Sequence, residues 1–266
     1  MGVVRTRVLG VAAMVMVALL TGCASGPPVD YSHLGADDVV FRFMELRGDP
    51  IPTSVAFEVP AVTVFGNGRV VRPVPSEGYP WPEVTQQWLT PSGMRRLLDA
   101  ARDAGLAKQT DFGEVDGVVG SGGVVFRVVD RVTFVGMPTL GLTIPRMRVR
   151  AFMAQLGNLD RWMGWDLSAE EPYSAPGIAV IAFEQGPETG AEPAWPLSDL
   201  GLGVPVRAAV CTVYDAADLA PVRNAVTPNG YQRVWRSNGM SYWIMVRPLL
   251  PGDTGCASTA IEDVFG

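Results

Sequence analysis

The sequence predicts an α+β protein with antiparallel sheets built from hairpin-plus-helix units, helices packed on one face, and two sub-domains. Three observations support this fold class. β-Branched runs are joined by short Gly/Asn turns, two amphipathic helical patterns each follow such a hairpin, and a non-periodic stretch at residues 166–175 separates two halves. With 48% hydrophobic and 18% charged residues, the chain has enough apolar surface to fold, which excludes an intrinsically disordered protein.

The N-terminus has the layout of a secretory signal peptide. Arg5 and Arg7 precede an apolar run at residues 8–20, which is shorter than the roughly 20 residues that a membrane-spanning helix needs. Leu20-Thr21-Gly22-Cys23 resembles the lipobox of bacterial lipoproteins, in which the cysteine is acylated before cleavage. We expect residues 1–22 to be a lipoprotein signal peptide and Cys23 to be the lipidation site; an ordinary cleaved signal with a chance cysteine is the alternative.

Acylation predicts a chain on the extracytoplasmic face of the cell membrane, held by its N-terminal acyl chains. Loss of Arg5 and Arg7 takes the formal net charge from -6 to -8, so a general basic attraction to lipid is not expected. The same acidic balance argues against nucleic acid as a partner. Residues 23–38 are expected to be a tether, at most ~50 Å long, because Pro27 and Pro28 interrupt a stretch without apolar periodicity. The tether contains His33, the only histidine, which receives no role.

Residues 39–170 are predicted to form an α+β domain of two hairpin-plus-helix units. Gly66-Asn67-Gly68 is a hairpin turn signal because these residues tolerate positive φ. Thr90 suits the N-cap of a helix that has Pro91 in its first turn and Gly105 just past its end. We expect strands at residues 39–46, 55–58, 62–65, 69–72, 124–129 and 131–135, and helices at residues 91–104 and 145–159.

Residues 171–266 are predicted to form a smaller α+β domain. We expect strands at residues 178–183 and 206–214, a Gly/Pro/Glu loop at residues 184–196, a helix capped by Asp215 and ending at Val226, and a hairpin of residues 231–236 and 240–247. With Cys23 assigned to lipid, Cys211 and Cys256 can pair with each other, and a disulfide is expected outside the membrane. A reactive or metal-binding pair is the alternative, but it lacks a CxxC spacing and a nearby histidine.

Other residue clusters give no clear catalytic or metal signature. The segment 117–123 is rich in glycine but lacks the Gly-Lys-Ser/Thr ending of a phosphate loop. Carboxylates in two loops are the remaining candidates for calcium binding or glycoside hydrolysis, without the spacing or the rigid support that either would need: Asp111, Glu114 and Asp116, and Glu184, Glu188 and Glu192. Trp235 and Trp243 are predicted to pair across their hairpin. No cofactor or metal is expected.

Four segments carry a resemblance to a known group of proteins: VTVFGNGRVVR, LTPSGMRRLLDAARDAGL, AAVCTVYDAADLAPVRNAV and WRSNGMSYWIMVRPLLPGDTGC. Together they resemble a family of secreted or lipid-anchored proteins of actinobacteria with no assigned activity. Because these segments are turns, helix caps and core faces, the resemblance implies a lineage and a fold plan and carries over no functional residue.

The sequence therefore favours a non-enzymatic, lipid-anchored envelope protein that acts as a binding or accessory module. Its partner would be another envelope protein or a small apolar ligand. One alternative is a carrier of apolar, lipid-like envelope molecules, with sheet and helices enclosing a cavity. A further alternative is a carboxylate-dependent hydrolase.

Overall fold

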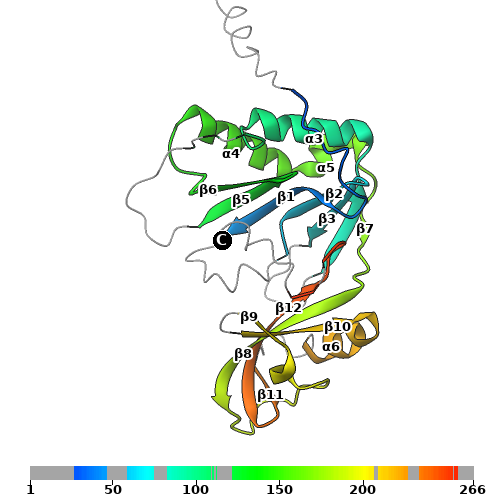
Figure 1. The fold of residues 1–266 in the computed structure, drawn as a ribbon, viewed down its shortest axis with the longest axis vertical. Helices are drawn as coiled ribbons and strands as arrows, with labels where there is room; N and C mark the ends of the chain where they lie inside the picture. The colour runs from blue at the N-terminus through cyan, green and yellow to red at the C-terminus, as the bar shows by residue number, and fades with distance from the viewer. Residues whose placement is uncertain are drawn as a thin grey trace, which may run out of the picture.

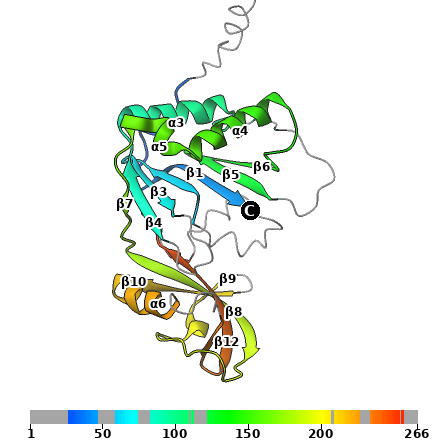
Figure 2. The ribbon, with the colours of Figure 1, turned by 180° about the vertical axis from the view of Figure 1, so that it is seen from behind.

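The structure is a computed structural model that describes residues 27–46, 59–74, 83–108, 110, 112, 122–206, 209–226, 234–253 and 255–256. Within these residues the expected fold class is confirmed: two antiparallel sheets of seven and five strands with four helices. Figures 1 and 2 show the helices α3, α4 and α5 on one side of the larger sheet and the smaller sheet at the opposite end of the molecule. Cys23 and the strand expected at residues 55–58 lie outside the described residues.

The larger sheet has the strand order β6-β5-β1-β2-β3-β4-β7, and all neighbours are antiparallel. Its strands are β1 (Val39–Leu46), β2 (Val62–Phe65), β3 (Arg69–Pro73), β4 (Val84–Trp88), β5 (Gly123–Val128), β6 (Arg131–Gly136) and β7 (Glu171–Pro172). Alternate residues of β1 face opposite sides, as the strand geometry requires. Phe41 and Phe43 belong to the core under the helices, whereas Met44 and Leu46 face the smaller sheet.

Three helices cover one face of this sheet: α3 (Pro91–Asp103), α4 (Ile144–Leu156) and the short α5 (Leu159–Met163). α3 begins as predicted, because Thr90 Oγ1 accepts a hydrogen bond from the Gly93 N–H at 3.1 Å. The single helix expected at residues 145–159 is instead two helices, since α4 ends before Gly157 and α5 begins at Leu159. A contiguous cluster of buried side chains from strands and helices fills the contact between them.

The smaller sheet has the order β11-β12-β8-β10-β9. Its elements are β8 (Gly177–Pro187), β9 (Val204–Val206), β10 (Ala209–Asp215), β11 (Val234–Ser237), β12 (Met240–Pro248), α6 (Leu219–Val226), and the 3-10 turns η2 (Leu200–Leu202) and η3 (Ala216–Asp218); a third such turn, η1 (Gly164–Asp166), follows α5. The predicted Asp215 cap is confirmed, because its carboxylate accepts a hydrogen bond from the Ala217 N–H at 2.8 Å. α6 buries Val222 and Val226 against this sheet.

The two sheets meet through a shared apolar cluster. Met44, Leu46 and Val125 of the larger sheet join Ile181 and Cys211 of the smaller one. The predicted disulfide Cys211–Cys256 is confirmed, with the two Cα atoms 5.9 Å apart. β7 pairs with β4, so residues 171–172 belong to the larger sheet, and the smaller sheet begins at β8.

The described part of the expected tether is attached to the body. Val29, Tyr31 and Leu34 pack against the core of the larger sheet. Backbone hydrogen bonds from residues 66 and 67 to the carbonyls of residues 38 and 36 hold its end. The segment from residue 27 therefore runs along the fold on the side of α3 and α4 (Figures 1 and 2).

Candidate functional site

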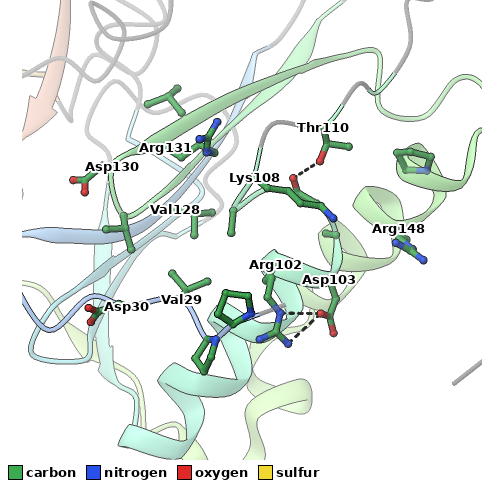
Figure 3. Close-up of a pocket in the computed structure, with 18 residues that line it drawn as sticks. Val29, Asp30, Arg102, Asp103, Lys108, Thr110, Val128, Asp130, Arg131 and Arg148 are labelled. Atoms are coloured by element: carbon green, nitrogen blue, oxygen red, sulfur yellow. Dashed lines mark hydrogen bonds and ion pairs between the residues drawn. The ribbon is translucent and has the colours of Figure 1, made fainter. Parts of the chain in front are cut away.

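An open groove of about 970 Å³ lies where the N-terminal segment passes α3 and α4. Four parts of the chain line it: residues 27–30; residues 102–105, 107, 108 and 110 at and after the end of α3; residues 128–132 at the β5–β6 turn; and Pro145 and Arg148 near the start of α4. Figure 3 shows the side chains that line it, with Val29 and Val128 near its centre and Asp30, Asp130 and Arg148 toward its edges. We take this groove as the candidate functional site.

The turn after α3 forms one wall of the groove. Gly105 has a φ of +89°, in the left-handed region that a helix C-terminus commonly needs. The Thr110 hydroxyl donates to the Gly105 carbonyl at 2.7 Å (Figure 3), and a Cβ at Gly105 would lie 2.8 Å from that hydroxyl oxygen. Because residue 105 is a glycine, Thr110 can lie close to it, and the turn held in this way places Lys108 at the rim of the groove.

The floor of the groove is apolar. Ala104, Val128 and Val129 are buried and Val29 is half-buried. Val129 adopts a φ of 56°, and its N–H donates to the Val40 carbonyl at 2.7 Å, which fixes the β5–β6 turn against β1. A ligand with an apolar part could therefore lie on a firm hydrophobic surface.

Charged side chains surround this floor, and some of them neutralise one another. Arg102 forms ion pairs with Asp99 at 2.8 Å and with Asp103 at 3.2 Å. His33 Nε2 lies 3.4 Å from an oxygen of Asp130, which links the N-terminal segment to the β5–β6 turn. The sequence assigned His33 no role, and this contact gives it a positional one.

Three cations at the rim keep their charge available. Within the described part of the chain, Lys108, Arg131 and Arg148 form no ion pair. Asp30 at the rim is also outside the ion pairs of the described residues, and its pKa is lowered mainly by hydrogen bonds from Ser32. Asp130 is in an ion pair only when His33 is protonated. Four cations and three carboxylates line the groove, so it carries a small net positive charge although the chain as a whole is acidic, which favours acidic groups.

The carboxylates that the sequence offered for hydrolysis lie elsewhere. Glu184 belongs to β8, so the loop expected from residue 184 begins later in the chain. The Glu192 carboxylate is held by Thr189 and Ser241, through hydrogen bonds of 2.9–3.1 Å. A hydrogen bond from its own backbone N–H is the main cause that lowers its pKa. The poor support expected for this residue was therefore wrong.

A glycosidase acid needs a carboxyl with a raised pKa. Among the described residues, five carboxyl groups have a pKa shift that is resolved, and each shift is downward: Asp30, Asp160, Asp166, Glu192 and Asp199. These five are ionised at neutral pH and cannot donate the proton. Asp111, Glu114, Asp116 and residues 117–121 lie outside the described residues. The described residues contain no group of three or more His, Cys, Asp or Glu side chains arranged to hold a metal ion.

The predicted pairing of Trp235 with Trp243 was wrong. Trp235 is opposite Tyr242 and Trp243 is opposite Val234, so the two indoles project from opposite faces of the sheet. Trp235 instead packs edge-on against Trp195, with ring centroids 5.5 Å apart. These contacts belong to the core of the smaller sheet and offer no stacking platform from this pair.

The sequence did not indicate the groove residues because they come from three separate parts of the chain: the turn after α3 with Lys108, β6 with Arg131, and α4 with Arg148. The sequence did contain one indication of an exposed apolar surface. Leu142 and Ile144 lie beside Pro145 but do not belong to the residues that α4 turns toward the core. Such residues mark an apolar surface next to a helix start.

In the part of the chain that the structure describes, no helix has the length and hydrophobicity to cross a membrane. Comparison of the chain with protein-family models, with curated proteins and with solved structures finds no match.

Proposed function

We propose that this chain is a lipid-anchored extracytoplasmic envelope protein whose folded body is a non-enzymatic binding module. The groove is its binding surface, and the partner carries acidic groups and an apolar part. The proposal depends on one observation above the others: the lipobox cysteine Cys23 is only four positions before Pro27, which lines the groove. The binding surface and the anchor are therefore at the same end of the molecule. The resemblance to actinobacterial envelope proteins is consistent with this location.

The chemistry of the groove supports an acidic partner. Lys108, Arg131 and Arg148 surround an apolar floor, and their charges are not cancelled by ion pairs within the described residues. Charges that converge on a hollow raise the local concentration of oppositely charged groups more than the same charges spread over a flat surface. The apolar floor then adds a hydrophobic contribution for a partner that has both parts.

The apolar floor also supports the alternative of a carrier of lipid-like molecules, but with a different binding place from the enclosed cavity that the sequence suggested. The contact between the larger sheet and its helices is filled by buried side chains, so a carried molecule would lie in the surface groove and not in an interior between sheet and helices. The hydrolase alternative gains no support from the five carboxylates whose pKa values are lowered.

Anchoring is tested by expressing the full chain in a bacterium fed an alkyne-labelled fatty acid. We expect the wild-type chain to be labelled and to fractionate with membranes, and Cys23→Ala to lose both properties. Mass spectrometry of the mature N-terminal peptide identifies the acyl groups. An unmodified Cys23 in a processed wild-type chain would refute the anchor.

Binding is tested by capture from native membranes, followed by mass spectrometry of the bound proteins and lipids. The groove variant Lys108→Glu/Arg148→Glu is compared with Arg161→Glu, which changes an exposed arginine on α5 outside the groove. We expect the groove variant to lose an acidic partner that the wild-type and Arg161→Glu chains retain. Equal capture by all three chains would refute the assignment to the groove.

A further inference from the structure

We infer that the folded body docks onto the surface of the membrane that carries its anchor. This inference depends on the proposed lipid anchor and names the partner of the groove as the lipid surface itself. The contact is made by a docking face, which we define as the exposed apolar residues at the start of α4 together with two cations of the groove rim. Its members are Leu140, Leu142, Ile144 and Met147, with Lys108 and Arg148.

The anchor keeps this end of the body close to the lipid. A free tether of residues 23–38 would allow the body to move some 50 Å away. Residues 29–34 instead pack against the core, and His33 contacts Asp130. Only three residues, 24–26, lie between Cys23 and Pro27, so the acylated cysteine is at most four residue steps, about 14 Å at full extension, from the described fold.

The apolar members of the docking face are at this same end. Leu142 is 81% exposed and Ile144 is 62% exposed, and the groove is lined by Pro145 and Arg148 as well as by Pro27. α4 turns Val149, Phe152 and Leu156 toward the core, so the exposed residues Ile144 and Met147 lie on its outer side. An apolar surface beside a lipid anchor is positioned to enter the interface between headgroups and acyl chains.

The fold holds this apolar loop in place. Arg146 is buried, and its guanidinium donates to the carbonyls of Phe112 at 2.7 Å, Gly136 at 2.8 Å and Met137 at 3.0 Å. Arg150 donates to the carbonyls of Thr139 at 3.1 Å and Gly141 at 3.2 Å. The charged hydrogen bonds to Gly136, Met137, Thr139 and Gly141 thus keep the loop from folding back onto the body, so Leu142 remains exposed.

Charge gives the docking a preferred orientation. The mature chain carries a formal net charge of -8, so most of its surface is repelled by an anionic bilayer. The groove is different because its lining has four cations and three carboxylates: Arg102, Lys108, Arg131 and Arg148 against Asp30, Asp103 and Asp130. An anionic bilayer therefore attracts this end and repels the remainder.

The test uses the full, acylated chain reconstituted into vesicles. Since Cys23 is acylated and Cys211 is bonded to Cys256, the variant Leu142→Cys has one free thiol for an environment-sensitive NBD dye. The matched control is Leu202→Cys, because Leu202 in η2 is 80% exposed and lies in the smaller sheet's half. Vesicles contain phosphatidylcholine alone or a mixture with phosphatidylglycerol, and iodide in the water quenches any exposed dye.

We expect dye at position 142 to show blue-shifted emission and a several-fold loss of iodide quenching relative to position 202. The protection should be greater with phosphatidylglycerol and should decrease in Lys108→Glu/Arg148→Glu. Dye at Ile144→Cys provides a second position, in case Leu142→Cys fails to fold. Equal quenching at 142, 144 and 202 on anchored chains would overturn the docking and leave the proposed anchor intact. Failure of the anchor itself is read separately, as an unmodified Cys23 in the mass spectrum before labelling.

Discussion

Removal of the Cys211–Cys256 disulfide should destabilise the protein strongly. The bond joins β10 to the end of the described chain, across a separation of 45 residues that contains α6, β11 and β12. Cys211 is fully buried in the cluster shared by the two sheets. The appropriate variant is Cys211→Ala/Cys256→Ala, because serine would bury an unpaired hydroxyl at position 211.

The expected loss follows from the entropy of the unfolded chain. Closing a loop of this length restricts the unfolded state by about 4 kcal/mol on the chain-entropy model. For a domain of this size, each kcal/mol lowers Tm by about 2–4 °C, so a decrease of about 8–16 °C is expected. The denaturant m value should rise as well, because the unfolded chain without the crosslink exposes more surface.

The assay is urea and thermal unfolding of the wild-type and double-alanine chains, each with and without dithiothreitol. Reductant should lower the stability of the wild type to near that of the variant and should leave the variant unchanged. A Tm difference under about 2 °C between oxidised and reduced wild type would refute the reasoning. It would mean that the unfolded chain already keeps these segments together.

Three further substitutions test other contacts. Arg146→Met removes the guanidinium hydrogen bonds to the carbonyls of Phe112, Gly136, Met137 and Leu140 and should lower the free energy of unfolding by about 3 kcal/mol in urea titrations; a loss below about 1 kcal/mol would show that these bonds do not stabilise the loop. Asp253→Asn leaves Arg247 without its carboxylate partner at 3.2 Å, where both side chains are buried, and a loss of about 3–5 kcal/mol is expected by the same method; unchanged stability would contradict a buried charge pair. Burial raises the pKa of Tyr173 from 10.0 to about 12, so its contribution to stability is complete below pH 10 and is lost as the pH rises through about 12. Unfolding curves between pH 9 and 12 should fall less steeply in Tyr173→Phe than in the wild type, and parallel curves would contradict the assignment.

Elements defined by local signals were predictable from the sequence. The start of α3 needs only Thr90 and Pro91, and its end needs only Gly105, so the expected helix agrees closely with the observed one. β4 was missed because two glutamines interrupt its apolar pattern. Gln87 is nevertheless buried, since it bonds to Arg72 at 2.5 Å and to Asp160 at 2.9 Å, and these partners are far away in the sequence.

The register of the last hairpin could have been derived in advance. Asn238 and Gly239 both adopt positive φ, as a two-residue type I′ turn requires, so Ser237 pairs with Met240. Applying that turn places Trp235 opposite Tyr242. The groove could not be derived in this way, because its cations meet only after α3, β6 and α4 have packed together.

The strand order also determines when each sheet can be completed. β1 is made first in the larger sheet but pairs with β5, which matches Leu46 with Gly123. In the smaller sheet, β8 lies between β10 and β12. Its pairing is therefore complete only after β12 has been synthesised and Met245 pairs with Ile181. Such long-range pairing slows folding, and unpaired strand edges invite association with other chains. A chain that emerges N-terminus first therefore exposes one open edge of β1 until β5 follows, and association through this edge competes with folding during that interval.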